Sequence, residues 1–245
     1  MPLENIAYFS DTTRVPYGVK RTDTIHGFTG QIIDHLLGRG VKLLIFACNT
    51  MAAVARDVVD ERAKARGITV LDVIDSGARE AARVSASGHI GVIGTPTTIN
   101  SNACARRIHA IAPHARVFSQ ACPLFVPLVE EGWLDHLVTR MTAQEYLKPV
   151  LAEQIDALVL GCTHYPLLKP LLKDVIGPGV HLIDSAVTVA EQTAQVLRGA
   201  NLAHTGVGAA SIPYCVSDVP LRFQSVGERF LGRTLERWRR WGLFD

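Results

Sequence analysis

Short apolar runs alternate with helix-like segments along most of this 245-residue chain. The runs are continuous, without polar residues at every second position, which is typical of strands that are covered on both faces. Repeated strand and helix segments predict an α/β fold with mostly parallel sheet. The predicted strands are Ile6–Phe9, Leu43–Ala47, Val70–Ile74, Ile90–Thr95, Val117–Gln120, Ala157–Gly161 and His181–Asp184.

Helix-like segments lie between these runs, and their order places the functional residues. In open α/β sheets, ligands bind beyond the carboxyl ends of the strands. Polar or reactive side chains directly after a predicted strand are therefore candidates for a site. The predicted helices are Thr22–Leu37, Thr50–Arg66, Gly77–Ser85, Thr97–Ile111, Ala143–Glu153, Pro166–Val175 and Val187–Leu197.

Composition excludes several classes of protein. The 25 Lys and Arg residues nearly balance the 23 Asp and Glu residues, so no broad basic field points to nucleic acid. No apolar run approaches the ~18 residues of a membrane span. The first residues carry no basic region followed by a long apolar stretch, so no secretory signal is expected. Five scattered cysteines fit free thiols in a reducing cytoplasm.

Two stretches share an unusual pattern, "LLIFACNTMAAV" and "LVLGCTHYPLL". In each, an apolar run ends in a small residue and is followed by a cysteine, Cys48 or Cys162, and then by two polar residues. Backbone N–H groups at the start of a helix lower a thiol pKa from about 8.5. The matched turns suggest two related α/β halves.

Four interpretations of these cysteines compete. They could be buried structural residues, since free cysteine is among the most buried residue types. A zinc site needs three or four clustered ligands, and the chain has no CxxC or HxxxH pattern. A single Cys–His nucleophile would use Cys162 and leave Cys48 unexplained. The fourth interpretation uses both thiols, one as base and one as acid on opposite faces of a stereocentre, with swapped roles for the other enantiomer.

The chain resembles glutamate racemase, within the aspartate/glutamate racemase superfamily, over nearly its whole length. The resemblance implies an isomerase that needs no metal or other cofactor and makes D-glutamate from L-glutamate for peptidoglycan, and so for cell wall biogenesis and cell shape. The stretches that carry it are "LENIAYFSDTTRVPYG", "FACNTMAA", "IGVIGTPTTINS", "ACPLFVPLVEEG", "LVLGCTHYPLL", "LIDSA" and the tail "SDVPLRFQSVGERFLGR".

By position, the resemblance implies that Cys48 and Cys162 are the two acid/bases and that His164 supports Cys162. Asparagine and threonine side chains with backbone N–H groups suit the carboxylates of glutamate without any arginine. Pro16 and Gly18 provide turn chemistry, because proline fixes φ and glycine permits a close backbone approach. The implied substrate-binding residues are Tyr17, Gly18, Asn49, Thr50, Thr163 and His164.

Four further residues have two interpretations each. Asp11 matches a family aspartate and could assist Cys48 or cap a turn. Thr95 and Thr98 follow a predicted strand and could bind substrate or cap a helix. Glu130 matches a family acid near the cleft, with a surface position as the alternative.

Relative to the family pattern, the sequence lacks an N-terminal strand and an Asp-Ser-Gly loop. The lost loop would normally support the first cysteine, so the activity of the chain as written is in doubt. "DSGA" at Asp75–Ala78 has the right letters but follows a different strand, so it is not assigned that role. A shortened gene model and a damaged or repurposed copy are both open.

These observations predict two α/β lobes, residues 1–72 with 184–245 and residues 73–183, with the active site in the cleft between them. Glutamate is the expected substrate, and no membrane or nucleic-acid partner is expected. A homodimer is left open. The rivals are another two-cysteine racemase, acting on aspartate or a hydantoin, and a catalytically impaired binding protein. The C-terminal "LERWRRWGLFD" is expected to be a helix end that packs on the domain.

Overall fold

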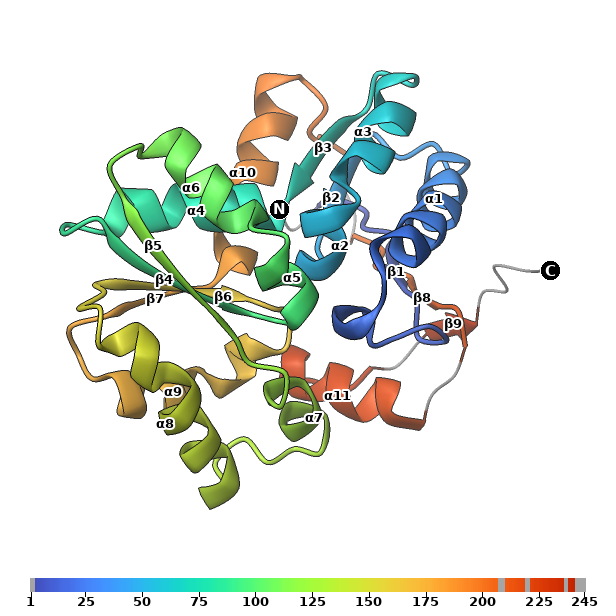
Figure 1. Ribbon diagram of the computed structural model, residues 1–245. Coiled ribbons are helices and arrows are strands. Elements are labelled where there is room, and N and C mark those ends of the chain that lie inside the picture. Colours follow the sequence, from blue (N-terminus) through green and yellow to red (C-terminus); the bar gives the residue numbers. More distant parts are fainter. Residues whose placement is uncertain (1–2, 207–209, 219–220, 236–237, 241–245) are drawn as a thin grey trace. The chain divides into compact units, whose positions relative to one another are not determined.

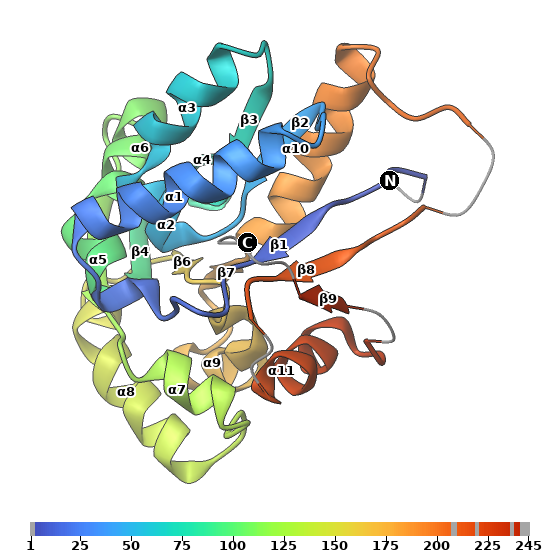
Figure 2. The same ribbon diagram turned by 90° about the vertical axis from the view of Figure 1, so that its right-hand side faces the viewer.

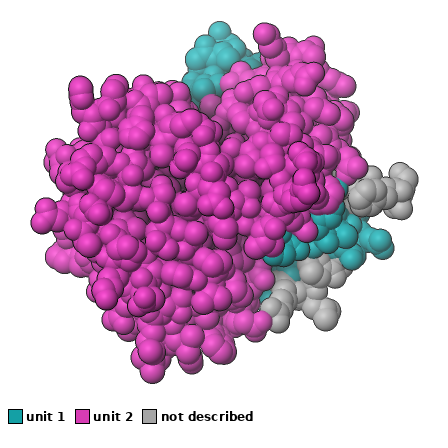
Figure 3. Space-filling model, in the orientation of Figure 1, with its two compact units in different colours: residues 1–16, 192–245 teal, residues 17–191 magenta. Residues whose placement is uncertain are grey.

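A computed structural model describes residues 3–206, 210–218, 221–235 and 238–240. The chain forms two compact units, shown in Figure 3. The smaller unit contains Met1–Pro16 and Gln192–Asp245, and the larger unit is Tyr17–Glu191. Both predicted cysteine turns belong to the larger unit, and the predicted lobe boundaries stay a prediction.

The smaller unit pairs strands from opposite ends of the sequence. Its three-stranded sheet has the order β1-β8-β9, with β1 at Tyr8–Ser10, β8 at Tyr214–Val216 and β9 at Trp238–Arg240. Both pairs are parallel, and β1 and β8 run side by side in Figure 2. The rings of Tyr8 and Tyr214 face each other across the sheet at 5.6 Å between centroids. The helix α11, Leu221–Leu231, follows β8.

The larger unit contains two parallel sheets, which confirms the α/β prediction (Figure 1). The two-stranded sheet pairs β2, Leu43–Phe46, with β3, Thr69–Asp72. The four-stranded sheet has the order β5-β4-β6-β7. Its strands are β4 at His89–Gly94, β5 at Arg116–Ala121, β6 at Ala157–Gly161 and β7 at His181–Ile183.

Helices cover both faces of the four-stranded sheet. In Figure 1, α8 and α9 lie on one face and α4 and α6 on the other, which explains why β6 is apolar along its whole length and β4 is apolar after His89. The helices of the larger unit are α1 Thr22–Leu37, α2 Asn49–Val54, α3 Arg56–Lys64, α4 Val73–Val84, α5 Pro96–Asn100, α6 Ala103–Ile111, α7 Phe125–Glu130, α8 Leu137–Leu151 and α9 Lys169–Ile176, with short 3-10 helices η1 Tyr17–Val19 and η2 Tyr165–Leu168. The helix α10, Ser185–Gly199, continues from this unit into the smaller one.

The main core lies between the four-stranded sheet and α7, α8 and α9. Phe125, Leu147, Leu158 and Tyr165 are fully buried there. Cys162 belongs to the same cluster, so the hydrophobic core holds one of the two candidate cysteines in place.

The strands β4 and β6 end at a pair of glycines. Gly94 lies opposite Gly161 in the parallel register. A Cβ atom on Gly161 would lie 2.7 Å from the Ile93 carbonyl oxygen, and one on Gly94 would lie 3.2 Å from the Gly161 carbonyl oxygen. Glycine is required at residue 161 because the neighbouring backbone approaches this closely.

Several predicted element boundaries were wrong. The predicted strand at Val70–Ile74 ends at Asp72, because the Asp72 carboxylate accepts a hydrogen bond from the Asp75 N–H and so begins α4. The predicted helix Thr50–Arg66 is two helices, α2 and α3, and the His26 ring binds the Val54 carbonyl at the break. The predicted helix Thr97–Ile111 is broken at Asn102, which has a left-handed φ of 55°.

Other elements were missed or placed differently. The helix α8 begins at Leu137, earlier than predicted, because the His136 side chain caps it by accepting from the Val138 N–H. The helix α7 and the strands β8 and β9 were not among the predicted elements. The tail expected to be a helix end contains β9, and its residues 236–237 and 241–245 lie outside the described residues.

Among the described residues, no helix has both the length and the apolar character that crossing a membrane requires.

Candidate active site

Cys48 lies at the carboxyl end of β2 and is the residue that precedes the first turn of α2. Its side chain is partly exposed. Burial raises the pKa of the Cys48 thiol, while hydrogen bonds from the Met51 and Thr50 N–H groups and from the Thr50 hydroxyl lower it, and the net change is upward. The groups that stabilise a Cys48 thiolate are therefore neutral donors.

Three buried threonines form a hydroxyl cluster beside this turn. The Oγ1 atom of Thr50 lies 3.0 Å from that of Thr95 and 3.2 Å from that of Thr98, and the last two are 3.0 Å apart. Thr95 also accepts a hydrogen bond from the Thr98 N–H and so caps α5. The cluster joins the start of α2 to the start of α5, after β4. Asn49, next to Cys48, is buried as well.

The predicted Tyr17–Gly18 turn packs against the same cluster. A Cβ atom on Gly18 would lie 2.6 Å from the Cβ atom of Thr95, so only glycine fits there. The Gly18 carbonyl accepts a hydrogen bond of 2.9 Å from the Thr97 hydroxyl. Tyr17 is buried, with its ring centroid 6.1 Å from that of Phe28. The larger unit thus brings Tyr17, Gly18, Thr50, Thr95 and Thr98 together.

Cys162 directly follows β6 and is only 8% exposed. Burial raises the pKa of the Cys162 thiol to about 12, against the lowering effect of hydrogen bonds from the His164 N–H and the Thr163 hydroxyl. The negative charges of Cys48 and Glu130 also raise this pKa. Thr163 itself is exposed.

His164 lies between Cys162 and Glu130. The Cys162 Sγ atom is 3.9 Å from His164 Nδ1, and His164 Nε2 is 3.3 Å from a carboxylate oxygen of Glu130. In the tautomer that donates its Nε2–H to Glu130, Nδ1 is the hydrogen-bond acceptor that faces the thiol. The structure therefore gives Glu130, which ends α7, a polar contact with a predicted site residue.

The two thiols interact with each other within the larger unit. The charge of a Cys48 thiolate raises the pKa of Cys162. A state with one thiolate and one thiol is therefore favoured over a state with two thiolates, because like charges disfavour joint ionisation.

Asp11 belongs to the smaller unit, where its carboxylate is buried. One oxygen accepts a hydrogen bond of 2.5 Å from Arg14 Nε, and the other accepts one of 3.0 Å from the Ser217 hydroxyl. These contacts tie β1 to the residue after β8. The predicted role of Asp11 as a partner of Cys48 stays a prediction.

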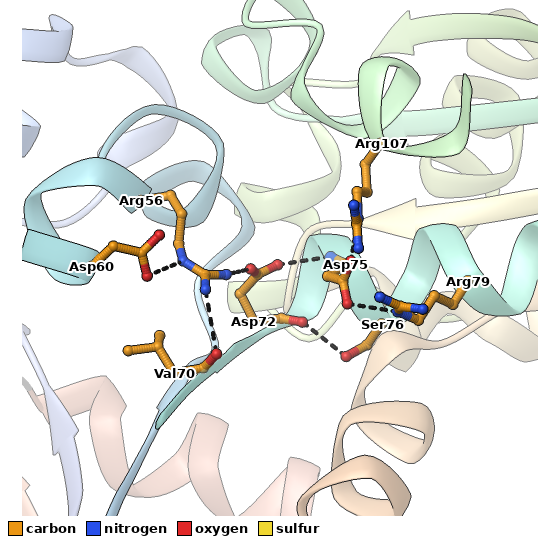
Figure 4. A network of polar contacts seen from close by, with 8 residues as sticks. All are labelled: Arg56, Asp60, Val70, Asp72, Asp75, Ser76, Arg79 and Arg107. Carbon is orange, nitrogen blue, oxygen red and sulfur yellow. Dashed lines mark hydrogen bonds and ion pairs between the residues drawn. The ribbon is translucent and has the colours of Figure 1, made fainter. Parts of the chain in front are cut away.

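Sequence reasoning missed Asp72, a buried carboxylate at the carboxyl end of β3. It contacts Arg56 and caps α4 (Figure 4). Nearby, Asp75 contacts Arg79 and Arg107. Asp72 fell inside the predicted strand Val70–Ile74, and nothing in the letters of "LDVIDSGA" distinguishes a helix cap from a strand residue or a ligand-binding residue. The contacts assign this network to joining α3, α4 and α6.

A second missed residue is Tyr165, whose hydroxyl donates a hydrogen bond of 2.8 Å to the Cys122 carbonyl. The signal was the tyrosine directly after "CTH" in a turn already singled out. Away from both cysteine turns, a hollow of about 410 Å³ is lined by residues of α4, α9 and α10, including Glu80, Arg83 and Lys169. Neither Cys48 nor Cys162 lines it.

Comparison with known proteins identifies relatives. A family model described as Asp/Glu/Hydantoin racemase matches residues 5–193. A glutamate racemase of Syntrophus aciditrophicus is 61% identical over 235 residues, which are 96% of this chain and 86% of that protein. One of Neisseria gonorrhoeae is 55% identical over 240 residues, 97% of this chain and 87% of that protein. The crystal structure of Francisella tularensis glutamate racemase in complex with D-glutamate has a TM-score of 0.92 at 39% identity, covering 99% of this chain and 89% of that one.

Proposed function

This chain belongs to the glutamate racemases of the Asp/Glu/Hydantoin racemase family, and we propose that it interconverts L- and D-glutamate with Cys48 and Cys162 as the two acid/bases. The observation that carries this assignment is the placement of two cysteines, each directly beyond the carboxyl end of a parallel strand, in the same compact unit. A base and an acid are both needed to invert a stereocentre, and two thiols can supply them.

Each turnover moves two protons and needs no oxidant or reductant. One thiolate takes the Cα proton of the substrate, and its sulfur becomes a thiol. The electron pair stays on Cα as a carbanion that is conjugated with the carboxylate. The other thiol then gives its proton to the opposite face of Cα and becomes a thiolate, so the two cysteines have exchanged roles. General acid–base catalysis of this kind contributes typically about 10²–10⁴-fold per group.

The surrounding side chains supply binding and orientation. Asn49, Thr50 and Thr163 offer amide and hydroxyl donors for the substrate carboxylates beside the two thiols. Tyr17 and Gly18 form the turn that packs on Thr95, and we include this turn, with Thr95 and Thr98, in the binding shell. His164 receives and returns the Cys162 proton, and Glu130 fixes the orientation of its ring.

Glutamate is the substrate we propose, since the Francisella tularensis relative was crystallised with D-glutamate. The direct test incubates the purified chain with L-glutamate, D-glutamate and, separately, L-aspartate, and follows optical rotation. Equal final rotation from both glutamate enantiomers is the expected result. Faster turnover of aspartate would favour the rival substrate, and glutamate binding without turnover would favour the catalytically impaired binding protein.

We also propose that no metal or pyridoxal cofactor takes part, because two thiols suffice for the proton transfers. Dialysis against a chelator should leave the rate unchanged. Loss of activity that zinc restores would contradict this part of the proposal.

The proposal further includes D-glutamate supply for peptidoglycan in the cytoplasm, a compartment in which the five free cysteines would stay reduced. Complementation of a bacterial strain that requires D-glutamate tests the biological role. A homodimer stays a prediction, which light scattering at assay concentration would test.

A further inference from the structure

We propose that Tyr165 is a positioning residue for proton transfer, which holds Cys162, His164 and Glu130 in register through a single hydroxyl hydrogen bond. The inference rests on the proposed function. Tyr165 is not among the predicted site residues. Its side chain is completely buried, so it acts through other groups and does not touch the substrate.

Tyr165 joins two segments that carry different parts of the site. Its N–H donates to the Cys162 carbonyl at 3.1 Å, which closes the turn that contains Cys162 and His164. Its hydroxyl donates to the Cys122 carbonyl at 2.8 Å, in the connection between β5 and α7. One residue therefore ties the turn after β6 to the segment that leads into α7.

The helix α7 returns to the same turn at its other end. Its last residue, Glu130, contacts His164 at 3.3 Å. Between these two contacts lies Phe125, whose ring meets that of Tyr165 edge-on at 5.2 Å and 90°. The short helix is thus held to the Cys162 turn at its start by Tyr165 and at its end by His164. Loss of the first contact removes the hydrogen bond that holds the start of α7 to the Cys162 turn, while the Phe125 ring contact and the Glu130–His164 contact remain.

That distance matters because proton transfer depends steeply on the placement of the reacting groups. The Cys162 Sγ and His164 Nδ1 atoms are 3.9 Å apart, near the outer limit for a hydrogen bond to sulfur. A shift of α7 by a fraction of an ångström would move Glu130, and with it the His164 ring. Burial also raises the pKa of Tyr165 well above its ordinary value, so the hydroxyl stays a donor throughout the assay range.

The chain offers a matched control in Tyr146. Its ring also packs edge-on against Phe125, at 5.4 Å and 81°, and its hydroxyl oxygen accepts a hydrogen bond of 3.4 Å from the Leu124 N–H. It lies on α8, and its hydroxyl contacts the segment before α7, whereas the Tyr165 hydrogen bonds include one within the Cys162 turn itself. Replacement of either tyrosine by phenylalanine removes one hydroxyl from the same aromatic cluster. In Tyr165→Phe, the Cys122 carbonyl keeps the Phe125 N–H as a donor at 3.2 Å, so the fold should be retained.

The experiment measures steady-state kinetics of Tyr165→Phe and Tyr146→Phe in both directions, together with their melting temperatures. Tyr165→Phe should lower kcat by about 10-fold or more with little change in KM for at least one enantiomer, as expected for a loss confined to the transition state. Tyr146→Phe should stay within about 2-fold of the unmodified chain. Replacement of residue 165 by 4-aminophenylalanine, which keeps a donor at the same place, should restore turnover.

A double-mutant cycle separates positioning from general loosening. If Tyr165 acts through Glu130 and His164, the variant that combines Tyr165→Phe with Glu130→Gln should lose much less than the product of the two single losses. A purely structural effect would multiply instead.

The outcomes are distinct. An unmodified chain that does not racemise glutamate overturns the proposed function and this inference with it. An active chain in which Tyr165→Phe behaves like Tyr146→Phe, or in which the double variant is multiplicative, overturns the inference alone. Should Tyr165→Phe fail to fold, the 4-aminophenylalanine variant decides, since a folded variant with a donor and low turnover would also overturn it.

Discussion

The two cysteine turns have nearly the same sequence pattern and very different surroundings. Cys48 is partly exposed, and the groups that stabilise its thiolate are the Thr50 hydroxyl and two N–H groups. Cys162 is buried and has two titratable neighbours, His164 and Glu130. The difference teaches that the same local motif, a strand followed by a cysteine and two polar residues, can have neutral hydrogen-bond donors around one cysteine and a histidine–carboxylate pair beside the other.

The largest expected effect tests whether both turns take part at all. Cys48→Ser and Cys162→Ser should each lower kcat for racemisation by about 10³-fold or more, because a serine hydroxyl is a far weaker acid than a thiol. Optical rotation with each glutamate enantiomer measures the loss. Cys104→Ala, a change at a buried cysteine of α6, should leave the rate near that of the unmodified chain. Substantial racemisation by either serine variant would sink the two-thiol mechanism.

The next effect concerns His164 and Glu130, the pair that lies beside Cys162. His164→Gln and Glu130→Gln should lower kcat by about 10–100-fold, with His164→Gln the larger loss because it removes the ring that contacts the thiol. The equilibrium constant between enantiomers is one, so kcat/KM must change equally in both directions. The difference between the turns should therefore appear as unequal kcat values compensated by KM. Equal kcat values in both directions would remove the proposed asymmetry.

A smaller effect is expected at the Cys48 turn, whose hydrogen-bond donors are uncharged. Thr95→Val removes a helix cap and one member of the threonine cluster beside Cys48, which should destabilise the protein by about 1–2 kcal/mol and raise KM. Urea denaturation and steady-state kinetics measure the two quantities. Thr142→Val serves as the control, since its hydroxyl donates to the Val138 carbonyl on the exposed side of α8. Unchanged stability in Thr95→Val would show that the cluster does not hold the Cys48 turn.

The smallest expected effect tests the difference in burial between the Cys48 and Cys162 side chains. Because the folded protein raises the pKa of Cys162 from an ordinary value near 9.0 to about 12, its buried thiol is favoured, and this contribution to stability is present below about pH 9 and is lost as pH rises toward 12. Cys162→Ser should make the alkaline fall in stability shallower, by at most one proton, about 1.4 kcal/mol per pH unit. Unfolding free energies between pH 8 and 10 provide the test. An unchanged slope would mean that Cys162 is not held as a buried thiol.

Most of the fold was predictable because each of the seven predicted strands overlaps an observed one. Apolar runs such as Ala157–Gly161 carry their own signal of burial on both faces. The strands β8 and β9 were not predicted, because three residues hold too short a pattern. In addition, β8 pairs with β1, which lies some 200 residues away in the sequence, and β9 pairs with β8. The break between α2 and α3 involves a distant ring, His26, which no local pattern reveals.

The candidate site divides in the same way. The polar residues after Cys48 and Cys162 could be identified directly from the sequence. The contact of Glu130 with His164 could not be predicted, since it depends on where α7 ends. Tyr165 was the hardest to predict, because its partner is a backbone carbonyl, which every amino acid presents alike. Side-chain letters carry no information about such an acceptor.

The glycine pair at the ends of β4 and β6 has a consequence for genetics. The obstacle to a larger residue at position 161 is the main-chain oxygen of Ile93, which is the same atom whatever amino acid stands at residue 93. A screen for second-site suppressors of Gly161→Ala should therefore recover no compensating substitution at the facing strand positions, in contrast to a screen started from a side-chain clash. Reversion to glycine would be the main route by which function returns. Residue 161, which precedes Cys162, therefore cannot change together with a compensating second residue, as pairs of buried side chains in protein cores often do.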